Sequence, residues 1–114
     1  MRAGIRDVGR RIRDSGRPDV PMRIAVLHVE LHIPYSQSLK DKRMVLRRVK
    51  DRLQKFNVAV AEVEHQERWQ RAALGIVAIS TTDAHVEREL AAAADEIDRV
   101  EPGLVTRTEI EYLR

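Results

Sequence analysis

The feature that most constrains the fold is the order in which hydrophobic periodicity changes along the chain. Between Met22 and Leu113, four stretches are apolar at every second position or nearly throughout, and two are apolar at every third or fourth position. The first pattern is typical of strands and the second of amphipathic helices. The predicted order of secondary-structure elements is therefore strand, helix, strand, strand, helix, strand.

The four predicted strands are rich in β-branched residues. They cover Arg23–Ile33, Asn57–His65, Arg71–Thr81 and Leu104–Leu113. The third is nearly all apolar, which is typical of a strand buried on both faces, so we expect it near the centre of the sheet.

The two predicted helices have recognisable starts. Ser38 is a good N-cap, with Asp41 at the spacing of a capping box, and this helix should run to about Phe56. Thr81 or Thr82 caps the second helix, which Pro102 and Gly103 end. The apolar residues at helical spacing are Leu39, Val45, Leu46, Val49, Leu53 and Phe56 in the first helix and Val86, Leu90, Ala93, Ile97 and Val100 in the second.

This order predicts an α+β protein with a ferredoxin-like βαββαβ arrangement. Two helices should cover one face of a four-stranded antiparallel sheet and leave the other face open. The length of 114 residues suits one domain, which we place at residues 22–114. This architecture hosts many functions, so function must be argued from individual sites.

Residues 1–21 carry the whole net charge of the chain. They hold six Arg and three Asp, so their net charge of +3 equals the chain total and residues 22–114 sum to zero. We interpret residues 1–21 as a flexible basic leader or as an extension added by an upstream start codon. An arm that binds nucleic acid is the alternative.

Several classes of protein are disfavoured by composition. The chain has no Cys, which excludes disulfides and thiolate metal sites. It has no run of 18 apolar residues for a membrane span and no secretory apolar segment, so we expect a cytoplasmic protein. No catalytic motif is recognisable, and we predict a protein that is not an enzyme and needs no cofactor.

Three sequence blocks occur in a familiar order: "VELHIPYSQSLKDKR" from Val29, "KFNVAVAEVEH" from Lys55 and "WQRAALG" from Trp69. Together they resemble the YlxP-like family, a small bacterial domain of unknown function. The resemblance covers about Met22 to Leu113. It implies a small cytoplasmic ferredoxin-like protein whose genes tend to lie near those for translation and ribosome maturation. It implies no catalytic residue.

The first helix is the main candidate for a binding surface. Leu39–Phe56 has a net charge of +6, and four of its cations fall within about 80° of one another over about 15 Å. These cations are Lys40, Arg43, Arg47 and Lys50. The stripe predicts a nucleic-acid or other anion interface that could follow RNA phosphates. The alternative is a solvated face, partly opposed by the acidic second helix, Asp83–Glu101, whose net charge is −5.

Lys42 differs from the other cations because its direction falls inside the apolar face of the helix. We interpret it as a side chain that snorkels past the sheet edge into water. The alternative is that Lys42 joins the candidate anion site, together with the free backbone N–H groups at the helix start.

His28, Glu30 and His32 should share the open side of the first strand. Residues four apart in a strand are separated by about 13 Å, so all three cannot bind one ion. We therefore predict no metal site and assign these side chains to an interaction surface. A pair completed by His65 or Glu62 from another strand is the alternative, and a metal-assisted hydrolase around His28, Glu30 and His65 would follow from it.

The open sheet face should support a homodimer. The first and third strands lack the aromatic platforms with which RNA-recognition domains stack bases, whereas uncovered apolar strands favour packing against a second copy. We expect the face to combine Ile24, Val26, His28 and Glu30 with Glu62 or Glu64 and Arg107 or Glu109. Trp69, between the second and third strands, should close the sheet end as a hydrophobic plug, or else serve as an exposed partner anchor.

The leading functional hypothesis is a small non-enzymatic bacterial binding protein, a homodimer that assists RNA or ribosome metabolism through its basic helix. The alternative is a homo-oligomeric module that binds a small ligand or a protein at the open sheet, without nucleic acid.

Overall fold

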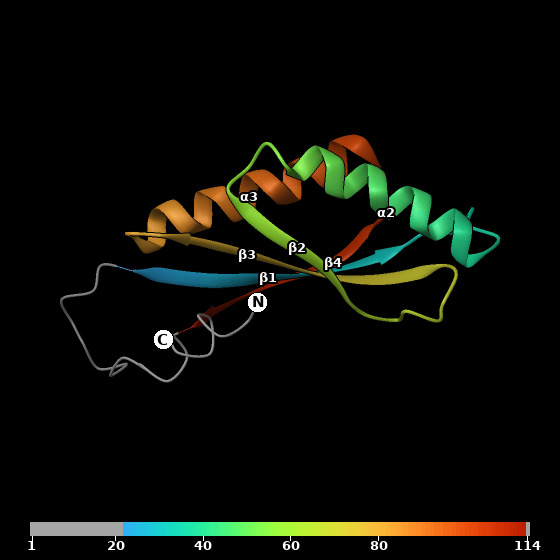
Figure 1. Cartoon of the computed structure of the whole chain (residues 1–114), viewed down its shortest axis with the longest axis horizontal. Coiled ribbons are helices and arrows are strands. Elements are labelled where there is room, and N and C mark those ends of the chain that lie inside the picture. Colours follow the sequence, from blue (N-terminus) through green and yellow to red (C-terminus); the bar gives the residue numbers. More distant parts are fainter. Residues whose placement is uncertain (1–21, 114) are drawn as a thin grey trace, which may run out of the picture.

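The computed structural model describes residues 22–113 (Figure 1). Along this part of the chain lie β1 (Arg23–His32), α2 (Leu39–Leu53), β2 (Val58–Glu64), β3 (Arg71–Ser80), α3 (Asp83–Val100) and β4 (Val105–Leu113). The order confirms the predicted succession of strands and helices. The predictions about residues 1–21 fall outside the described residues.

The four strands form one antiparallel sheet in the order β2-β3-β1-β4. Both helices lie on the same side of this sheet, and no helix or strand of residues 22–113 covers the other side (Figure 1). The predicted ferredoxin-like α+β fold and the central position of β3 are therefore confirmed. Neither helix in residues 22–113 is long and apolar enough to cross a membrane.

The core lies between the sheet and the two helices. β1 alternates, so its odd-numbered residues from Ala25 to Leu31 are buried beneath the helices, and Ile33 just after it is buried too. α3 packs on β1 and β3, whereas α2 packs beside α3 and over β2. Burying these apolar side chains contributes about 1.5–3 kcal/mol each for the larger ones. The helix residues buried in the core are Val45, Leu46, Val49 and Leu53 of α2 and Val86, Leu90, Ala93 and Ile97 of α3.

The helix starts follow the sequence signals with one adjustment. Ser38 Oγ accepts a hydrogen bond from the Asp41 N–H at 3.0 Å, and Asp41 Oδ2 accepts one from the Gln37 N–H at 2.9 Å. In a capping box the Asp41 carboxylate would accept from the backbone N–H of the N-cap, Ser38. Here it accepts from the N–H of the preceding residue, Gln37. Thr82 is the cap of α3, accepting from the His85 N–H at 3.1 Å. α2 ends at Leu53, earlier than predicted.

Candidate functional site

The outer face of α2 carries a basic stripe, which we define as Lys40, Arg43, Arg47 and Lys50. The first three side chains are exposed and that of Lys50 is partly exposed. Among residues 22–113, none of the four forms an ion pair with a carboxylate. The stripe is therefore a row of cations with no neutralising carboxylate partner among residues 22–113.

The other edge of α2 is neutralised by α3. Arg48 Nη2 lies 2.8 Å from Glu101 Oε2, and Arg52 Nε lies 3.1 Å from Glu96 Oε2. Glu101 also accepts a hydrogen bond from Tyr35 Oη at 2.7 Å, and burial together with this bond raises the pKa of Tyr35. The acidic residues 83–101 thus pair with other α2 cations, and none of them forms an ion pair with the stripe.

Glu96 is the buried acid at the centre of this contact. Its side chain is 1% exposed and contacts Arg52, Lys55 and Arg99. Burial alone would raise the pKa of Glu96. The hydrogen bond from Lys55 and the charges of Arg99, Lys55 and Arg52 together outweigh burial and hold this pKa below its usual value. Helical spacing puts Glu96 only at the edge of the apolar face of α3, so its burial could not be predicted from the sequence.

The lowered pKa of Glu96 predicts a pH-dependent effect of its removal. Its carboxylate contributes stability above the ordinary glutamate pKa of about 4.3, and this contribution is lost as pH falls through the lowered folded value. The Glu96→Gln variant should therefore be less stable than the unmodified chain at neutral pH, with a difference that shrinks below about pH 4. Urea unfolding between about pH 7 and about pH 3 measures this difference.

A matched control for this measurement is Asp95→Asn, because Asp95 is the exposed neighbouring acid on α3. It should change the free energy of unfolding by less than about 0.5 kcal/mol. A Glu96→Gln effect that stayed constant over the whole pH range would show that the charge of Glu96 is not what stabilises the contact.

Lys42 is buried, and the prediction that it snorkels into water is wrong. Its Nζ donates to Glu62 Oε2 at 2.8 Å, to the His65 carbonyl at 2.8 Å and to the Arg71 carbonyl at 3.3 Å. These internal acceptors come from the end of β2 and the start of β3. Lys42 therefore ties α2 to the β2–β3 connection and stands apart from the exposed basic stripe, with its ammonium turned away from any external anion.

A β-bulge near the end of β2 separates two carboxylates that regular alternation would place on one face. Glu62 is opposite Leu74, Glu64 is opposite Ala73, and the register shifts between them. Glu62 consequently faces the helix side, where it meets Lys42, and Glu64 faces the open side. The sequence left the choice between these two acids open, and the bulge decides it.

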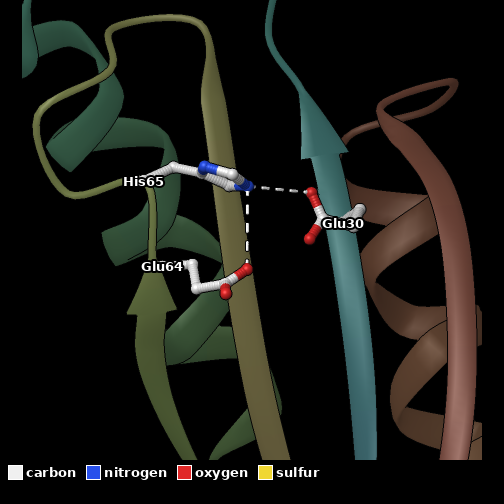
Figure 2. A group of neighbouring side chains, drawn as sticks. All are labelled: Glu30, Glu64 and His65. Carbon is white, nitrogen blue, oxygen red and sulfur yellow. Dashed lines mark hydrogen bonds and ion pairs between the residues drawn. The ribbon is translucent and has the colours of Figure 1, made fainter.

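Three polar side chains meet on the open face, and we call Glu30, Glu64 and His65 the acid–imidazole cluster (Figure 2). His65 Nε2 lies 3.2 Å from Glu30 Oε1 and 3.9 Å from Glu64 Oε1. Arg71 Nη2 lies 3.3 Å from the same Glu30 oxygen. Ala73 is opposite Glu30 on one side and Glu64 on the other, so its small side chain leaves room for the two acids to approach above it.

His65 occupies an unusual backbone position, with φ of 65° in the left-handed region. Its carbonyl accepts hydrogen bonds from the Arg68 N–H at 2.9 Å and from Lys42 Nζ. These bonds hold the turn that points the imidazole back across β3 toward β1, as Figure 2 shows.

The other two histidines of the open face do not join this cluster. His28 Nε2 lies 3.1 Å from Glu111 Oε1 on β4, and His32 is exposed at the end of β1. The structure thus combines Glu30 with His65, an alternative that the sequence had left open. It does not bring His28 or Glu62 to the same point.

Trp69 is 53% exposed, so the prediction that it plugs the sheet end is wrong and the exposed alternative describes its position. It lines a surface hollow of about 440 Å³ together with His32. The turn is secured instead by Gln70, whose Nε2 donates to the Pro34 carbonyl at 2.9 Å and the Ser36 carbonyl at 3.1 Å.

The open face divides into a polar half and an apolar half. The polar half contains the acid–imidazole cluster with Arg107 and Glu109. In the apolar half, Val63 and Ile79 are 47% and 45% exposed. A shallow hollow of about 280 Å³ in that half is lined by Val26, Ala59, Ala61, Val63, Gly75 and Val77, among others.

Comparison with known proteins assigns this chain to a protein family. Residues 24–110 match the family described as "Protein of unknown function (DUF503)". The chain belongs to this family. The "Uncharacterized protein YlxP" of Bacillus subtilis (strain 168) is 43% identical to the DUF503 chain over 76 residues, which are 63% of this chain and 82% of the relative. The resemblance to YlxP-like proteins is thus confirmed.

The fold of this DUF503 protein agrees with that of a solved designed protein. "De novo designed protein Foldit4" has a TM-score of 0.51 at 10% identity, covering 82% of this chain and 97% of its own. A C-terminal segment of the alpha subunit of aIF2 from Pyrococcus abyssi has a TM-score of 0.48 at 26% identity, covering 86% of this chain and 53% of its own.

Proposed function

We propose that this DUF503 protein is a non-enzymatic RNA-binding accessory factor of the bacterial cytoplasm, which acts in RNA or ribosome metabolism through the basic stripe of α2. The observation that carries the proposal is the contrast between two edges of one helix. Arg48 is paired with Glu101 at the C-cap of α3 and Arg52 with Glu96 of α3, whereas the stripe has no carboxylate partner among the described residues.

The stripe suits a phosphate backbone better than a single anion. Its four cations extend over about 15 Å of helix, so they can meet successive phosphates. Phosphate contacts supply most of the affinity in sequence-independent binding, and that affinity comes from released counterions. The location of YlxP-like genes near translation genes, which the family resemblance implies, makes RNA the favoured polyanion.

Salt dependence tests this function. A labelled single-stranded RNA, followed by fluorescence anisotropy, should bind the chain and lose affinity as salt rises. Four phosphate contacts predict a slope of about −2.8 in log affinity against log salt, since each contributes about −0.7 with single strands.

A shortened chain beginning at Met22 separates the stripe from the basic leader, and it should keep this slope. Absence of binding by the shortened chain at about 50 mM salt would contradict the proposal, because electrostatic binding is strongest there.

A second candidate function is homodimerisation through the apolar half of the open face. Exposed Val63 and Ile79 lie on neighbouring strands, with Val77 between them and Val26 beside Val77 on β1, and such contiguous apolar surface is typical of interfaces. Two copies related by a twofold axis would bury this half against itself. This candidate leaves α2 exposed and is compatible with RNA binding.

The double variant Val63→Lys/Ile79→Lys should convert a dimer into a monomer, because four lysines would be forced into one apolar contact. Light scattering at about 10 μM, a concentration at which a micromolar dimer is populated, measures the mass. Met44→Lys is the matched control, since Met44 is 49% exposed but lies on α2. A monomer mass for the unmodified chain would exclude this candidate.

A further inference from the structure

We propose that Glu30, Glu64 and His65 form a binding site for a first-row divalent metal ion of the Zn²⁺ class, on the polar half of the open sheet face (Figure 2). This site lies on the face opposite the helices. The inference is independent of the RNA-binding proposal.

The spacing of the donor atoms fits an ion at the centre of the cluster. An ion with bonds of about 2.0–2.2 Å in tetrahedral geometry separates its ligand atoms by roughly 3.3–3.6 Å. His65 Nε2 and Glu30 Oε1 are 3.2 Å apart, His65 Nε2 and Glu64 Oε1 are 3.9 Å apart, and all three donor atoms lie within 4.8 Å of one another. Small side-chain rotations are sufficient to bring Glu64 into bonding distance.

The donor types select the class of ion. Imidazole nitrogen suits zinc and its neighbours in the first transition row, whereas sites for Mg²⁺ and Ca²⁺ use oxygen ligands. Two carboxylates with one imidazole and the paired cation Arg71 leave a net negative charge when His65 is neutral, and the neighbouring Arg107 is offset by Glu109. A divalent ion would compensate this charge.

The surroundings leave room for further ligands. A hollow of about 200 Å³ is bordered by Glu30 and Glu64, so water or an external ligand can complete the coordination shell. Glu30 Oε1, the oxygen beside His65, also accepts a hydrogen bond from Arg71 Nη2 at 3.3 Å, and a carboxylate oxygen has lone pairs for both this bond and an ion. Glu30 can therefore bind an ion while keeping Arg71 as the hydrogen-bonding neighbour that orients it.

Zinc titration of the untagged full-length chain tests the site. Isothermal calorimetry with Zn²⁺ should show one ion bound per chain, and saturating Zn²⁺ should raise the melting temperature. Mg²⁺ at the same concentration should produce no shift. Glu64→Gln should weaken Zn²⁺ binding by at least about 100-fold. Loss of a residue that only hydrogen-bonds to a metal ligand weakens binding by up to about 100-fold, so a larger effect identifies Glu64 as a ligand.

Glu64 is the best residue to replace, because its side chain is 67% exposed and its removal should not disturb folding. His28→Gln is the matched control: His28 is on the same face but points to Glu111, so this variant should bind Zn²⁺ like the unmodified chain. No zinc binding by the unmodified chain, equal affinity in Glu64→Gln, or equal loss in His28→Gln would each overturn the proposal and leave the cluster as an ion-pair network.

Discussion

Replacing Lys42 with methionine is expected to lower the free energy of unfolding by about 3 kcal/mol, the lower end of the range for breaking a buried ion pair. Methionine can fill much of the space of the aliphatic part of the lysine side chain, but it supplies neither a positive charge nor a hydrogen-bond donor. Glu62 would lose its cation, and the carbonyls of His65 and Arg71 would lose a hydrogen bond. The side chain of Glu62 remains 19% exposed, so partial hydration keeps the loss near the lower end.

Urea unfolding followed by circular dichroism measures this loss. Lys40→Met is the control on the same helix, and because Lys40 is exposed it should change stability by less than about 0.5 kcal/mol. The double variant Lys42→Met/Glu62→Met removes both charges and should recover part of the loss. A cost below about 1 kcal/mol for Lys42→Met alone would mean that the ammonium does not anchor the β2–β3 connection.

Reversing two charges of the basic stripe is expected to weaken RNA binding by roughly a thousandfold at low salt. A charge pair at contact is worth about 1 kcal/mol in water, so Arg43→Glu/Arg47→Glu removes two attractions and adds two repulsions, about 4 kcal/mol in total. The salt slope should fall to about half, because two cationic contacts of four remain. Fluorescence anisotropy with the same RNA measures both quantities.

The control for this experiment carries the same change in net charge at a different place. Arg68 and Arg88 are exposed and form no ion pair with residues 22–113, so Arg68→Glu/Arg88→Glu tests charge without touching the stripe. It should keep at least most of the affinity of the unmodified chain. If both double variants lost binding equally, the net charge of the protein, and not the stripe, would govern the interaction.

Lys42 shows where reading the sequence stops being sufficient. Helical spacing correctly placed its direction between Leu39 and Leu46, in the buried face of α2. Spacing cannot reveal what lies opposite a side chain, and a lysine at such a position usually extends its charge into water. Here the opposite position holds Glu62 and three backbone carbonyls, so the charge stays inside.

The acid–imidazole cluster shows the same limit in the sheet. Alternation in β1 placed Glu30 on the open face, as the structure confirms. The residue that joins Glu30 and His65 is Glu64, and regular alternation would have assigned it to the same face as Glu62. A bulge adds one residue to one strand only, and it depends on the pairing partner as well as on the local sequence.

The sequence by itself determined the six elements between Met22 and Leu113, their order, the cap of α2 and most of the core, and it narrowed the cap of α3 to Thr81 or Thr82, because these depend on local periodicity and local hydrogen bonds. Only the tertiary structure decided which cations of α2 remain free, why Lys42 is buried and which acids meet His65. These features depend on charges brought together from distant parts of the chain, and their energies are set by the burial and distance that the fold creates.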